Sequence, residues 1–301
     1  MPEVIELRKY ADFLRSKLKN NYIREINILK GRYKKHKPFE LYSTIIKHLP
    51  IKVLDIQTKG KFLYFKLDHG IYLFSTLGLS GGWAFLSKSS DKYFFPLESN
   101  YIKTNLVNSY KKRSLNHLNV EFVTDKGSIY FYDTLSFGTL KGIDNNEELH
   151  KKLESIGPDI MDEKTTFIIF KDKITKSTQI NKPIGNVIMN QKLISGIGNY
   201  LRADILWLCK ISPFRLVKDL SDNNLKDIYS AAKLLTWADY NYNKGIKYGY
   251  IKKKDKVPKD YGRNFFIYKQ DEDIYKNPVI KEELYEGSQK RTIHWVKIIQ
   301  K

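Results

Sequence analysis

The sequence has one cysteine, Cys209, among its 301 residues, and it has few acidic residues for its basic content. A single cysteine excludes an intrachain disulfide and any zinc site built from several cysteines. No run of about 18 apolar residues and no signal-like segment is present, so we expect neither a membrane span nor secretion, but an intracellular protein of the cytoplasm or nucleus. The 53 Lys and Arg against 33 Asp and Glu give a formal net charge of +20, which predicts a polyanionic partner.

This excess of positive charge has two interpretations. It is either a solvated surface in a protein whose Lys, Ile, Asn and Tyr content reflects an AT-rich genome, or a surface that neutralises phosphates. Basic and aromatic residues are interleaved in Tyr110–Arg113 and in the stretch from Tyr248 to Lys254. Because such interleaving places stacking groups beside cations, it favours a nucleic acid as the partner.

Two periodicities divide the chain. Apolar residues at helical spacing from Leu7 to Leu18 predict an amphipathic helix, and alternation from Val53 to Phe137 predicts antiparallel strands. Hairpin turns are expected at Asp68–Gly70 and Asp125–Gly127. Since short strands need a second layer to bury their apolar faces, we expect an antiparallel β-sandwich with a leading helix over residues 1–138.

The second half of the chain is predicted to be mainly helical, which makes the fold class α+β. Polar residues 139–152 suggest a linker, and residues 153–264 a helical domain with one helix from Ile197 to Leu208 and another beginning at a Ser221 cap. Strand character returns in residues 265–301, with a turn at Asn277-Pro278 and a strand from Thr292 to Ile298.

Pro2 and Glu3 form a candidate reaction centre. A small residue after Met1 permits removal of the methionine, which would leave a secondary amine beside a carboxylate. An α-amino group has a pKa of about 8, so a sizeable neutral fraction exists near pH 7. Such an amine can attack the anomeric carbon of a nucleotide, expel the base and form a Schiff base through which the strand is cut. Proline at position 2 is common, however, so this pair alone also fits an ordinary N-terminus.

Six segments together resemble the formamidopyrimidine-DNA glycosylase/endonuclease VIII family, and they occur in the family's order. These segments are Pro2–Leu7, Thr58–Lys61, Phe74–Trp83, Ser155–Ile160, Ser195–Leu206 and Lys290–Val296. The resemblance covers essentially the whole chain. It implies a helix-two-turn-helix motif in the C-terminal domain and DNA bound in a positive cleft.

The resemblance also implies catalytic roles. Pro2 would be the nucleophile, Glu3 would protonate the sugar ring during base release, and Lys61 would contact phosphate and assist strand cleavage. Glu3 has a second interpretation, as a carboxylate that complements a helix dipole. Glu6 is either a polar support at the reaction centre or an ordinary first-turn carboxylate.

Further matches imply contacts with DNA. Gly196, Gly198 and Asn199 open a helix, where glycines let the backbone approach a phosphate and Asn199 would clamp the DNA backbone. A helix capped by Asn199 without any ligand is the alternative. His117 matches a histidine that contacts DNA in relatives. The alternative is a surface histidine without a role in binding.

An enzyme that extrudes a base must fill the gap with an apolar or planar wedge. Leu79 replaces the methionine wedge of the family, and Phe137 is the expected second wedge, although both could instead pack in the core at strand ends. Leu135 and Ser136 occupy two positions where the family has arginines. The polar contact to the orphaned partner base is therefore in doubt, and discrimination of that base should be weak. Val4-Ile5 is a second departure, because relatives mostly have Gly-Pro beside the nucleophile.

The C-terminal tail lacks the four cysteines that form a zinc hairpin in many relatives. It resembles the zincless-finger branch, in which packing alone would hold a two-stranded hairpin. Arg291 would reach phosphate and the extruded nucleotide, unless it is an ordinary strand arginine. We expect no metal and no organic cofactor.

The sequence therefore predicts a bifunctional DNA glycosylase and abasic-site lyase of base-excision repair, acting by β,δ-elimination. We expect a monomer whose partner is double-stranded DNA with a damaged base or abasic site, with single-stranded DNA as a second candidate. The zincless tail favours oxidised pyrimidines. The alternatives are an oxidised-purine glycosylase and a non-catalytic binder of damaged or single-stranded DNA.

Overall fold

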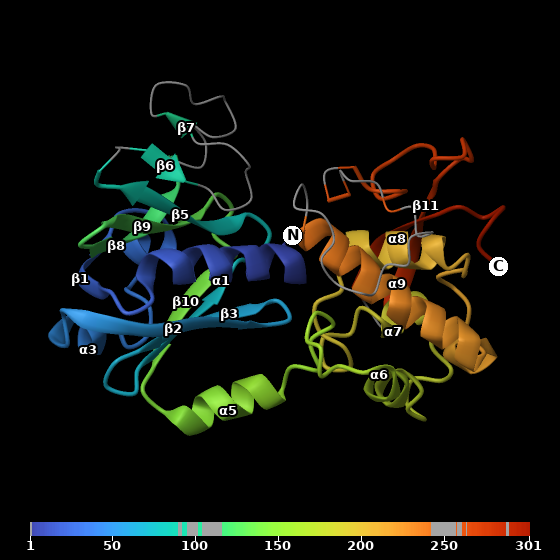
Figure 1. The fold of residues 1–301 in the computed structure, drawn as a ribbon, viewed down its shortest axis with the longest axis horizontal. Helices are drawn as coiled ribbons and strands as arrows, with labels where there is room; N and C mark the ends of the chain where they lie inside the picture. The colour runs from blue at the N-terminus through green and yellow to red at the C-terminus, as the bar shows by residue number, and fades with distance from the viewer. Residues whose placement is uncertain are drawn as a thin grey trace. The chain divides into compact units, whose positions relative to one another are not determined.

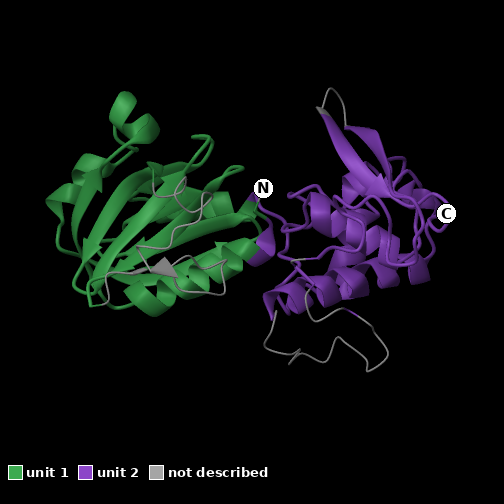
Figure 2. Ribbon diagram, turned by 90° about the horizontal axis from the view of Figure 1, so that it is seen from above, with its two compact units in different colours: residues 1–2, 6–154 green, residues 3–5, 155–301 purple. Residues whose placement is uncertain are grey.

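The computed structural model describes two compact units (Figure 2), one of residues 1–2 and 6–154 and the other of residues 3–5 and 155–301. No helix in the described part of the chain is long and apolar enough to cross a membrane. The interleaved segments at 110–113 and 248–254 lie outside the described residues. The described residues are 2–89, 92–94, 102–103, 116–241, 257, 261–262, 264–286 and 289–301.

The first unit contains the leading helix and an antiparallel sheet of ten strands (Figure 1). Its helices are α1 (Val4–Leu18), α2 (Gly31–Lys35), α3 (Tyr42–Lys47) and α5 (Asn146–Glu154). Its strands, in sheet order, are β10 (Thr139–Ile143), β4 (Tyr72–Thr76), β3 (Phe62–Leu67), β2 (Ile51–Lys59), β1 (Tyr22–Ile28), β8 (Leu118–Thr124), β9 (Gly127–Asp133), β5 (Gly81–Ser87), β6 (Lys92–Phe94) and β7 (Ile102–Lys103).

The two halves of this sheet face each other as the layers of a sandwich, as the alternating pattern predicts. Trp83 of β5 is fully buried, and its ring lies 5.0 Å from that of Phe65 on β3 and 5.3 Å from that of Phe131 on β9, measured between centroids. The apolar face of α1 packs into the same core through Leu7, Tyr10 and other residues at helical spacing. The expected hairpins are present at both Asp-x-Gly turns.

Residues 139–152 do not form the linker that the sequence suggests. Thr139–Ile143 pair with Tyr72–Thr76 as an edge strand, and α5 follows within the same unit. The glycine that made this segment resemble a loop has a packing reason, because a Cβ at Gly142 would lie 2.8 Å from the carbonyl oxygen of Glu40. The unit boundary therefore falls after Glu154.

The second unit is helical and ends in a hairpin. Its helices are α6 (Phe167–Ile174), α7 (Ile184–Val187), α8 (Asn199–Leu208), the 3₁₀ helix η1 (Val217–Asp219) and α9 (Asp222–Tyr240). Ser221 caps α9 as predicted, since its hydroxyl accepts from the Asn224 N–H while the Asn224 side chain accepts from the Ser221 N–H.

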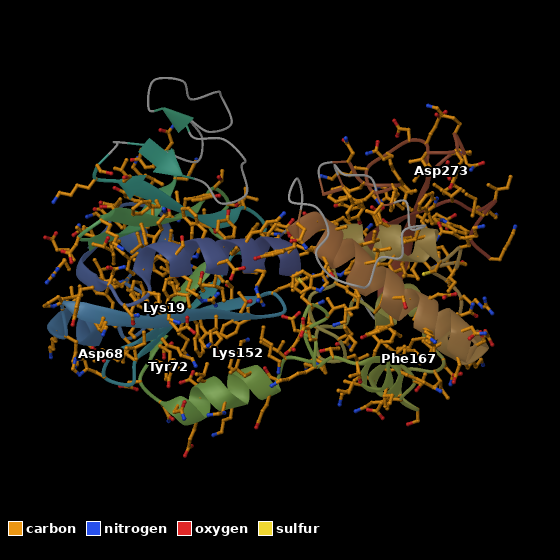
Figure 3. The ribbon with its side chains drawn as sticks, in the orientation of Figure 1. Lys19, Asp68, Tyr72, Lys152, Phe167 and Asp273 are labelled. Carbon is orange, nitrogen blue, oxygen red and sulfur yellow. The ribbon has the colours of Figure 1, made fainter. Side chains whose placement is uncertain are left out.

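The tail forms the expected two-stranded hairpin, in which β11 (Ile280–Glu286) pairs with β12 (Gln289–Trp295). The second strand ends at Trp295, three residues before the predicted end at Ile298. Leu284, Ile293 and Trp295 form a small apolar cluster that also includes Phe214. The turn before the hairpin is held by Asp273 (labelled in Figure 3), whose carboxylate accepts from the backbone N–H of Asn277 at 2.9 Å.

Residues 3–5 belong to the second unit, although the rest of α1 belongs to the first. Val4 and Ile5 are buried in its core, and the Val4 N–H donates to the carbonyl oxygen of Gly196 at 3.2 Å. The bulky pair that departs from the Gly-Pro of relatives therefore has a structural role, since it fills an apolar core.

Candidate functional site

Glu3 is held by the first turn of a helix almost two hundred residues later in the chain. Its Oε2 accepts from the Gly198 N–H at 2.6 Å and its Oε1 accepts from the Tyr200 N–H at 3.0 Å. The side chain is 2% exposed. A carboxylate at a helix N-terminus is stabilised by the unpaired N–H groups and by the helix dipole, so Glu3 is fixed in place.

The N-cap of α8 differs from the alternative interpretation in which Asn199 caps this helix. Gly198 is the N-cap residue and Asn199 is the first residue of the helix, so Glu3 supplies the carboxylate that caps it. The dipole that Glu3 complements is thus that of α8, whereas α1 has Glu6 in its own first turn. Glu6 is half-buried, and no role at the reaction centre is established for it.

The two glycines before α8 have contacts inside the protein. Gly196 has a φ of +112°, and a Cβ there would lie 2.8 Å from the Cβ of Val4, so only glycine lets the N-terminal segment approach. The Gly196 N–H donates to Gln191 at 2.9 Å and the Gly198 N–H donates to Glu3. Because both N–H groups are engaged, contact of either glycine with DNA stays a prediction.

Arg202, which the sequence analysis did not single out, connects several expected site residues. Its guanidinium is fully buried and donates through Nη2 to Asn199 Oδ1 at 3.2 Å and to the carbonyl oxygen of Thr292 at 3.0 Å. Since the amide oxygen of Asn199 is taken, its NH₂ group is oriented as a donor, which suits a phosphate oxygen. The sequence did contain an indication of this contact, because Arg202 follows Asn199 by three residues and so lies on the same face of the helix.

The charge of Arg202 couples to two more expected site residues. The pKa of Arg202 is lowered to about 10, chiefly by burial and then by the positive charge of Arg291, while the carboxylate of Glu3 opposes both effects. Arg291 is exposed on β12, directly before Thr292. The second unit therefore brings Glu3, Asn199 and Arg291 around one buried cation.

Asp204 is a second residue that the sequence analysis missed. It is fully buried, and its oxygens accept from the backbone N–H groups of Phe266 at 3.0 Å, Ile267 at 3.1 Å and Tyr268 at 3.3 Å. Burial raises the pKa of Asp204 to about 6, although these N–H groups favour the charged form. The carboxylate thus anchors the segment that leads into the hairpin bearing Arg291.

Lys61 lies in the first unit, at the turn between β2 and β3, where Gly60 has a φ of +54°. Its neighbours attach this turn to α5. The Nζ of Lys59 donates to the carbonyl oxygen of Leu153 at 2.7 Å, and Lys152, labelled in Figure 3, lies over the ring of Phe62 with 5.2 Å between Nζ and ring centroid. The turn that carries Lys61 is therefore fixed on both sides.

Leu79, Leu135 and Phe137 lie on two loops of the first unit, residues 77–80 and 134–138, which we call the wedge loops. Their side chains are 52%, 54% and 60% exposed, so the alternative that Leu79 and Phe137 pack in the core is wrong. A Cβ at Gly78 would lie 2.8 Å from Phe137, so the two loops touch.

One buried carboxylate joins the wedge loops. Asp133 Oδ1 accepts from the hydroxyl of Ser80 at 2.5 Å, and its Oδ2 accepts from the Gly138 N–H at 2.6 Å. The Asp133 N–H donates to the carbonyl oxygen of His117 at 3.2 Å, so His117 lies beside the same loops. The first unit therefore gathers Leu79, His117 and Phe137, and it holds Lys61 on a separate turn.

Comparison with known proteins gives two family matches. Residues 1–140 match the formamidopyrimidine-DNA glycosylase N-terminal domain, and residues 156–239 match the formamidopyrimidine-DNA glycosylase H2TH domain. The formamidopyrimidine-DNA glycosylase of Mycoplasma pneumoniae is 28% identical over 224 residues, 73% of this chain and 71% of that protein. Endonuclease 8 of Salmonella arizonae is 25% identical over 233 residues, 77% of this chain and 76% of that protein.

Solved structures share the fold over the full chain. The Lactococcus lactis formamidopyrimidine-DNA glycosylase, non-covalently bound to DNA with an abasic site, superposes with a TM-score of 0.71 at 19% identity and covers 100% of both chains. The MutM protein of Thermus thermophilus gives a TM-score of 0.71 at 20% identity and covers 99% of this chain and 98% of that one. The α+β fold class with an N-terminal β-sandwich and a helical C-terminal domain is thereby confirmed.

Proposed function

Because the chain belongs to the formamidopyrimidine-DNA glycosylase/endonuclease VIII family and is a DNA glycosylase of base-excision repair, we propose that it works through the amine of Pro2. The observation that carries the proposal is the fixed carboxylate of Glu3, which is covalently joined to Pro2 and bonded through both oxygens to α8. An N-terminal amine whose neighbouring carboxylate cannot swing away is placed for concerted nucleophilic and acid-base chemistry.

The proposed reaction begins when the free amine of Pro2 attacks C1′ of the damaged nucleotide. The bond from C1′ to the base breaks, and the base leaves with the bonding electron pair and takes a proton from water. The carboxylate of Glu3 accepts the N–H proton that Pro2 loses and passes it to the ring oxygen of the sugar, so that the sugar opens. The nitrogen of Pro2 is then joined to C1′ as an iminium ion. Loss of a proton from C2′ expels the 3′ phosphate, and a second elimination expels the 5′ phosphate.

The remaining residues are proposed to bind DNA. Lys61 and Arg291 would hold phosphates and assist the two eliminations, and the amide NH₂ of Asn199 would clamp the backbone of the damaged strand. Leu79 and Phe137 would fill the gap that the extruded nucleotide leaves, because large exposed apolar side chains on anchored loops suit insertion between bases.

The preferred lesion is proposed to be an oxidised pyrimidine. The cysteine-free tail supports this preference, and relatives named endonuclease 8 are among the matches. The second candidate is an oxidised purine. The presence of relatives named formamidopyrimidine-DNA glycosylase among the matches supports this candidate. Paired duplexes, one with an oxidised pyrimidine and one with an oxidised purine at the same position, decide between them by the rates of base release.

Borohydride trapping tests the mechanism. Tag-free protein is incubated with an abasic-site oligonucleotide and sodium borohydride, which reduces an iminium ion to a stable covalent bond. We expect a covalent complex with the protein that has a free Pro2, and none with a form extended by one residue before Pro2, whose nitrogen is an amide. Pro2→Gly, which replaces the secondary amine with a primary amine, should trap at a reduced rate.

The outcome of trapping separates the enzyme from a binding protein. If the extended form traps as well as the free form, Pro2 is not the nucleophile. If no form traps while all bind abasic DNA tightly, the chain is a non-catalytic binder of damaged DNA, and the proposed function is wrong.

A further inference from the structure

A row of exposed basic residues lies in the first unit, on and around α2. We call it the basic strip, and its members are Lys30, Arg32, Lys34, Lys35, His36 and Lys37. All six side chains are exposed. Among the residues that the structure describes, none of the six forms an ion pair with an acidic group. Their charges are therefore available to an external anion.

The strip is anchored to the core by two buried aromatic residues within and after it. The hydroxyl of Tyr33 donates to the carbonyl oxygen of Leu140 at 3.2 Å and accepts from the Leu140 N–H at 2.5 Å. Phe39 is 4% exposed and packs edge-on against the ring of Tyr33 at 5.8 Å. A segment fixed in this way presents its cations at defined positions, in contrast to a mobile basic tail.

The strip lies beside the wedge loops. The guanidinium of Arg32 donates to the carbonyl oxygen of Gly138 at 3.5 Å, one residue after Phe137. Lys30 Nζ donates to the carbonyl oxygen of Asn116 at 3.4 Å, one residue before His117. Two members of the strip are thus bonded to the backbone next to two expected DNA contacts.

The acidic group nearest to the strip in sequence does not neutralise it. Glu40 lines the same hollow as Arg32, His36 and Lys37, but its carboxylate lies 3.4 Å from Lys141 Nζ, which also pairs with Glu148. The hollow, which lies between the strip and β10, is thus predominantly basic, and it is open to solvent.

We propose that the basic strip binds the phosphates of the undamaged strand of duplex DNA. This inference rests on the proposed function, in which Phe137 helps to fill the gap that the extruded nucleotide leaves opposite the orphaned base of that strand. Leu135 and Ser136 bring no charge to the orphaned base. The basic strip, in contrast, is bonded through Arg32 to the wedge loop at Gly138, and so it is placed for the phosphates of the strand that carries this base. Phosphate contacts of this kind fix the register of a duplex without reading its sequence.

The test combines loss of protein charge with loss of phosphate charge on one strand at a time. The strip variant is Lys34→Gln/Lys35→Gln/Lys37→Gln. Affinity is measured by fluorescence anisotropy for a duplex with an uncleavable abasic-site analogue, in which the linkages near the lesion are phosphodiesters or uncharged methylphosphonates, in either the undamaged or the damaged strand.

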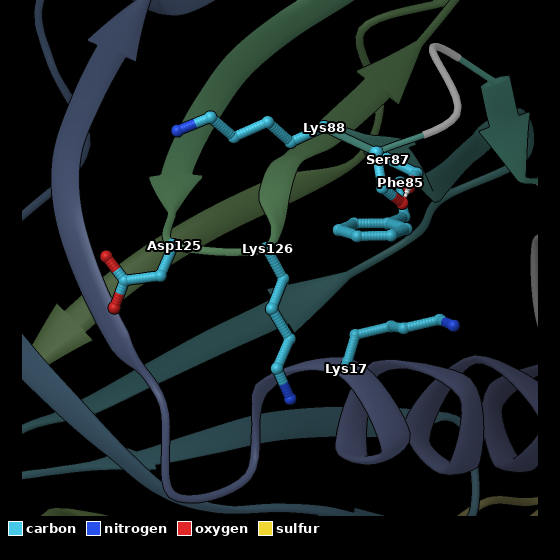
Figure 4. A pocket seen from close by; sticks show the side chains of 7 residues that line it. Lys17, Phe85, Ser87, Lys88, Asp125 and Lys126 are labelled. Carbon is cyan, nitrogen blue, oxygen red and sulfur yellow. Dashed lines mark hydrogen bonds between the residues drawn. The ribbon is translucent and has the colours of Figure 1, made fainter.

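The matched control removes three lysines from a second basic surface (Figure 4), as Lys17→Gln/Lys88→Gln/Lys126→Gln. This surface lies at the end of β9 that is away from the wedge loops. Lys126 precedes β9, whose far end is Asp133, and a seven-residue strand spans roughly 20 Å. The control changes the net charge equally, so it corrects for non-specific attraction.

We expect methylphosphonates in the undamaged strand to weaken binding of the wild type and the control variant, and to have little effect on the strip variant. Methylphosphonates in the damaged strand should weaken binding of all three proteins equally. The strip variant should also lose up to about 2.7 from the slope of log K against log salt concentration, at about 0.9 for each phosphate contact. Circular dichroism melting curves check that each variant is folded.

Three results overturn the inference. The strip variant could stay as sensitive as the wild type to neutralisation of the undamaged strand, it could lose sensitivity to the damaged strand instead, or the control variant could show the same loss. Borohydride trapping of each variant on a single-stranded abasic oligonucleotide reports separately on the proposed function. Failure of trapping would leave the strand-specific binding measurement intact.

Discussion

At the residue scale, Arg202 is a buried cation that the second unit uses as a connector. Its two Nη atoms donate to acceptors on α8, α7 and β12, at Asn199, Gly185 and Thr292. Lysine keeps the charge but lacks the planar fork that reaches several acceptors. Because Arg202 holds the amide of Asn199 and the backbone beside Arg291, we expect it to be a positioning residue.

We expect Arg202→Lys to lower the free energy of unfolding by roughly 2 kcal/mol, because buried hydrogen bonds from a charged group are lost. Binding of abasic DNA should weaken as well. Urea unfolding and anisotropy measure the two effects. In an Asn199→Ala background the loss of binding from Arg202→Lys should be smaller, and strictly additive losses would contradict the connection to Asn199.

Asp204 makes the stability depend on pH in a predictable direction. Its folded pKa is about 6 against 3.8 for an ordinary aspartate, so between these values the folded protein binds a proton that the unfolded chain does not. The contribution of this group is therefore present at low pH and is lost as pH rises through 6. From pH 8 to pH 5 it should stabilise the fold by about 1.4 kcal/mol, corresponding to one proton over one unit beyond the folded pKa.

Comparison with Asp204→Asn isolates this contribution, because asparagine does not titrate. The difference in the free energy of unfolding between wild type and variant, measured by urea unfolding, should grow as the pH falls from 8 to 5. A constant difference over that range would show that the carboxyl keeps its ordinary pKa.

At the scale of elements, the wedge loops separate function from stability. Phe137 is 60% exposed whereas Phe131, on the strand before it, is fully buried. We expect Phe137→Ala to change the free energy of unfolding by less than about 0.5 kcal/mol but to weaken binding of a lesion duplex. Phe131→Ala should cost about 3–5 kcal/mol, because it opens a cavity in the core. Equal effects of the two variants on stability would contradict the exposed position of Phe137.

The hairpin of β11 and β12 is expected to depend on apolar packing. Ile293 is fully buried against Leu284 and Trp295, so Ile293→Ala should lower the stability of the protein by about 2–4 kcal/mol. Prolonged treatment with a chelator should leave the melting temperature of the wild type unchanged. A fall in the melting temperature that added zinc reverses would mean that a metal contributes to the fold.

The elements themselves were largely predictable from local patterns. The helix beginning near Val4, both Asp-x-Gly hairpins and the Ser221 cap follow from periodicity and turn chemistry, which act over a few residues. Residues 139–152 were misassigned because a short edge strand takes its register from β4, about seventy residues earlier. Arg202 and Asp204 were missed for a related reason, since the Thr292 acceptor of Arg202 and the Phe266 donor of Asp204 lie more than sixty residues further along the chain.

At the scale of the whole molecule, the net charge of +20 predicts salt-sensitive binding. Lys61 and Arg291, together with three lysines of the basic strip, would neutralise five phosphates. The slope of log K against log salt concentration should therefore be about −4.5 for a duplex with an uncleavable lesion analogue, measured between about 50 and 300 mM KCl. A slope shallower than about −2 would mean that most of the positive charge is merely solvated.

The bond between Glu3 and α8 also has a consequence for the second unit when it is separated from the first. That unit takes its helix cap and part of its core from residues 3–5, which lie far from its other residues in the sequence. Residues 155–301 expressed alone would lack that cap, and a synthetic peptide with the sequence of the first residues should behave as their ligand. The segment next to the proposed nucleophile is therefore expected to stabilise the second unit as well, in the way that a bound ligand stabilises a folded protein.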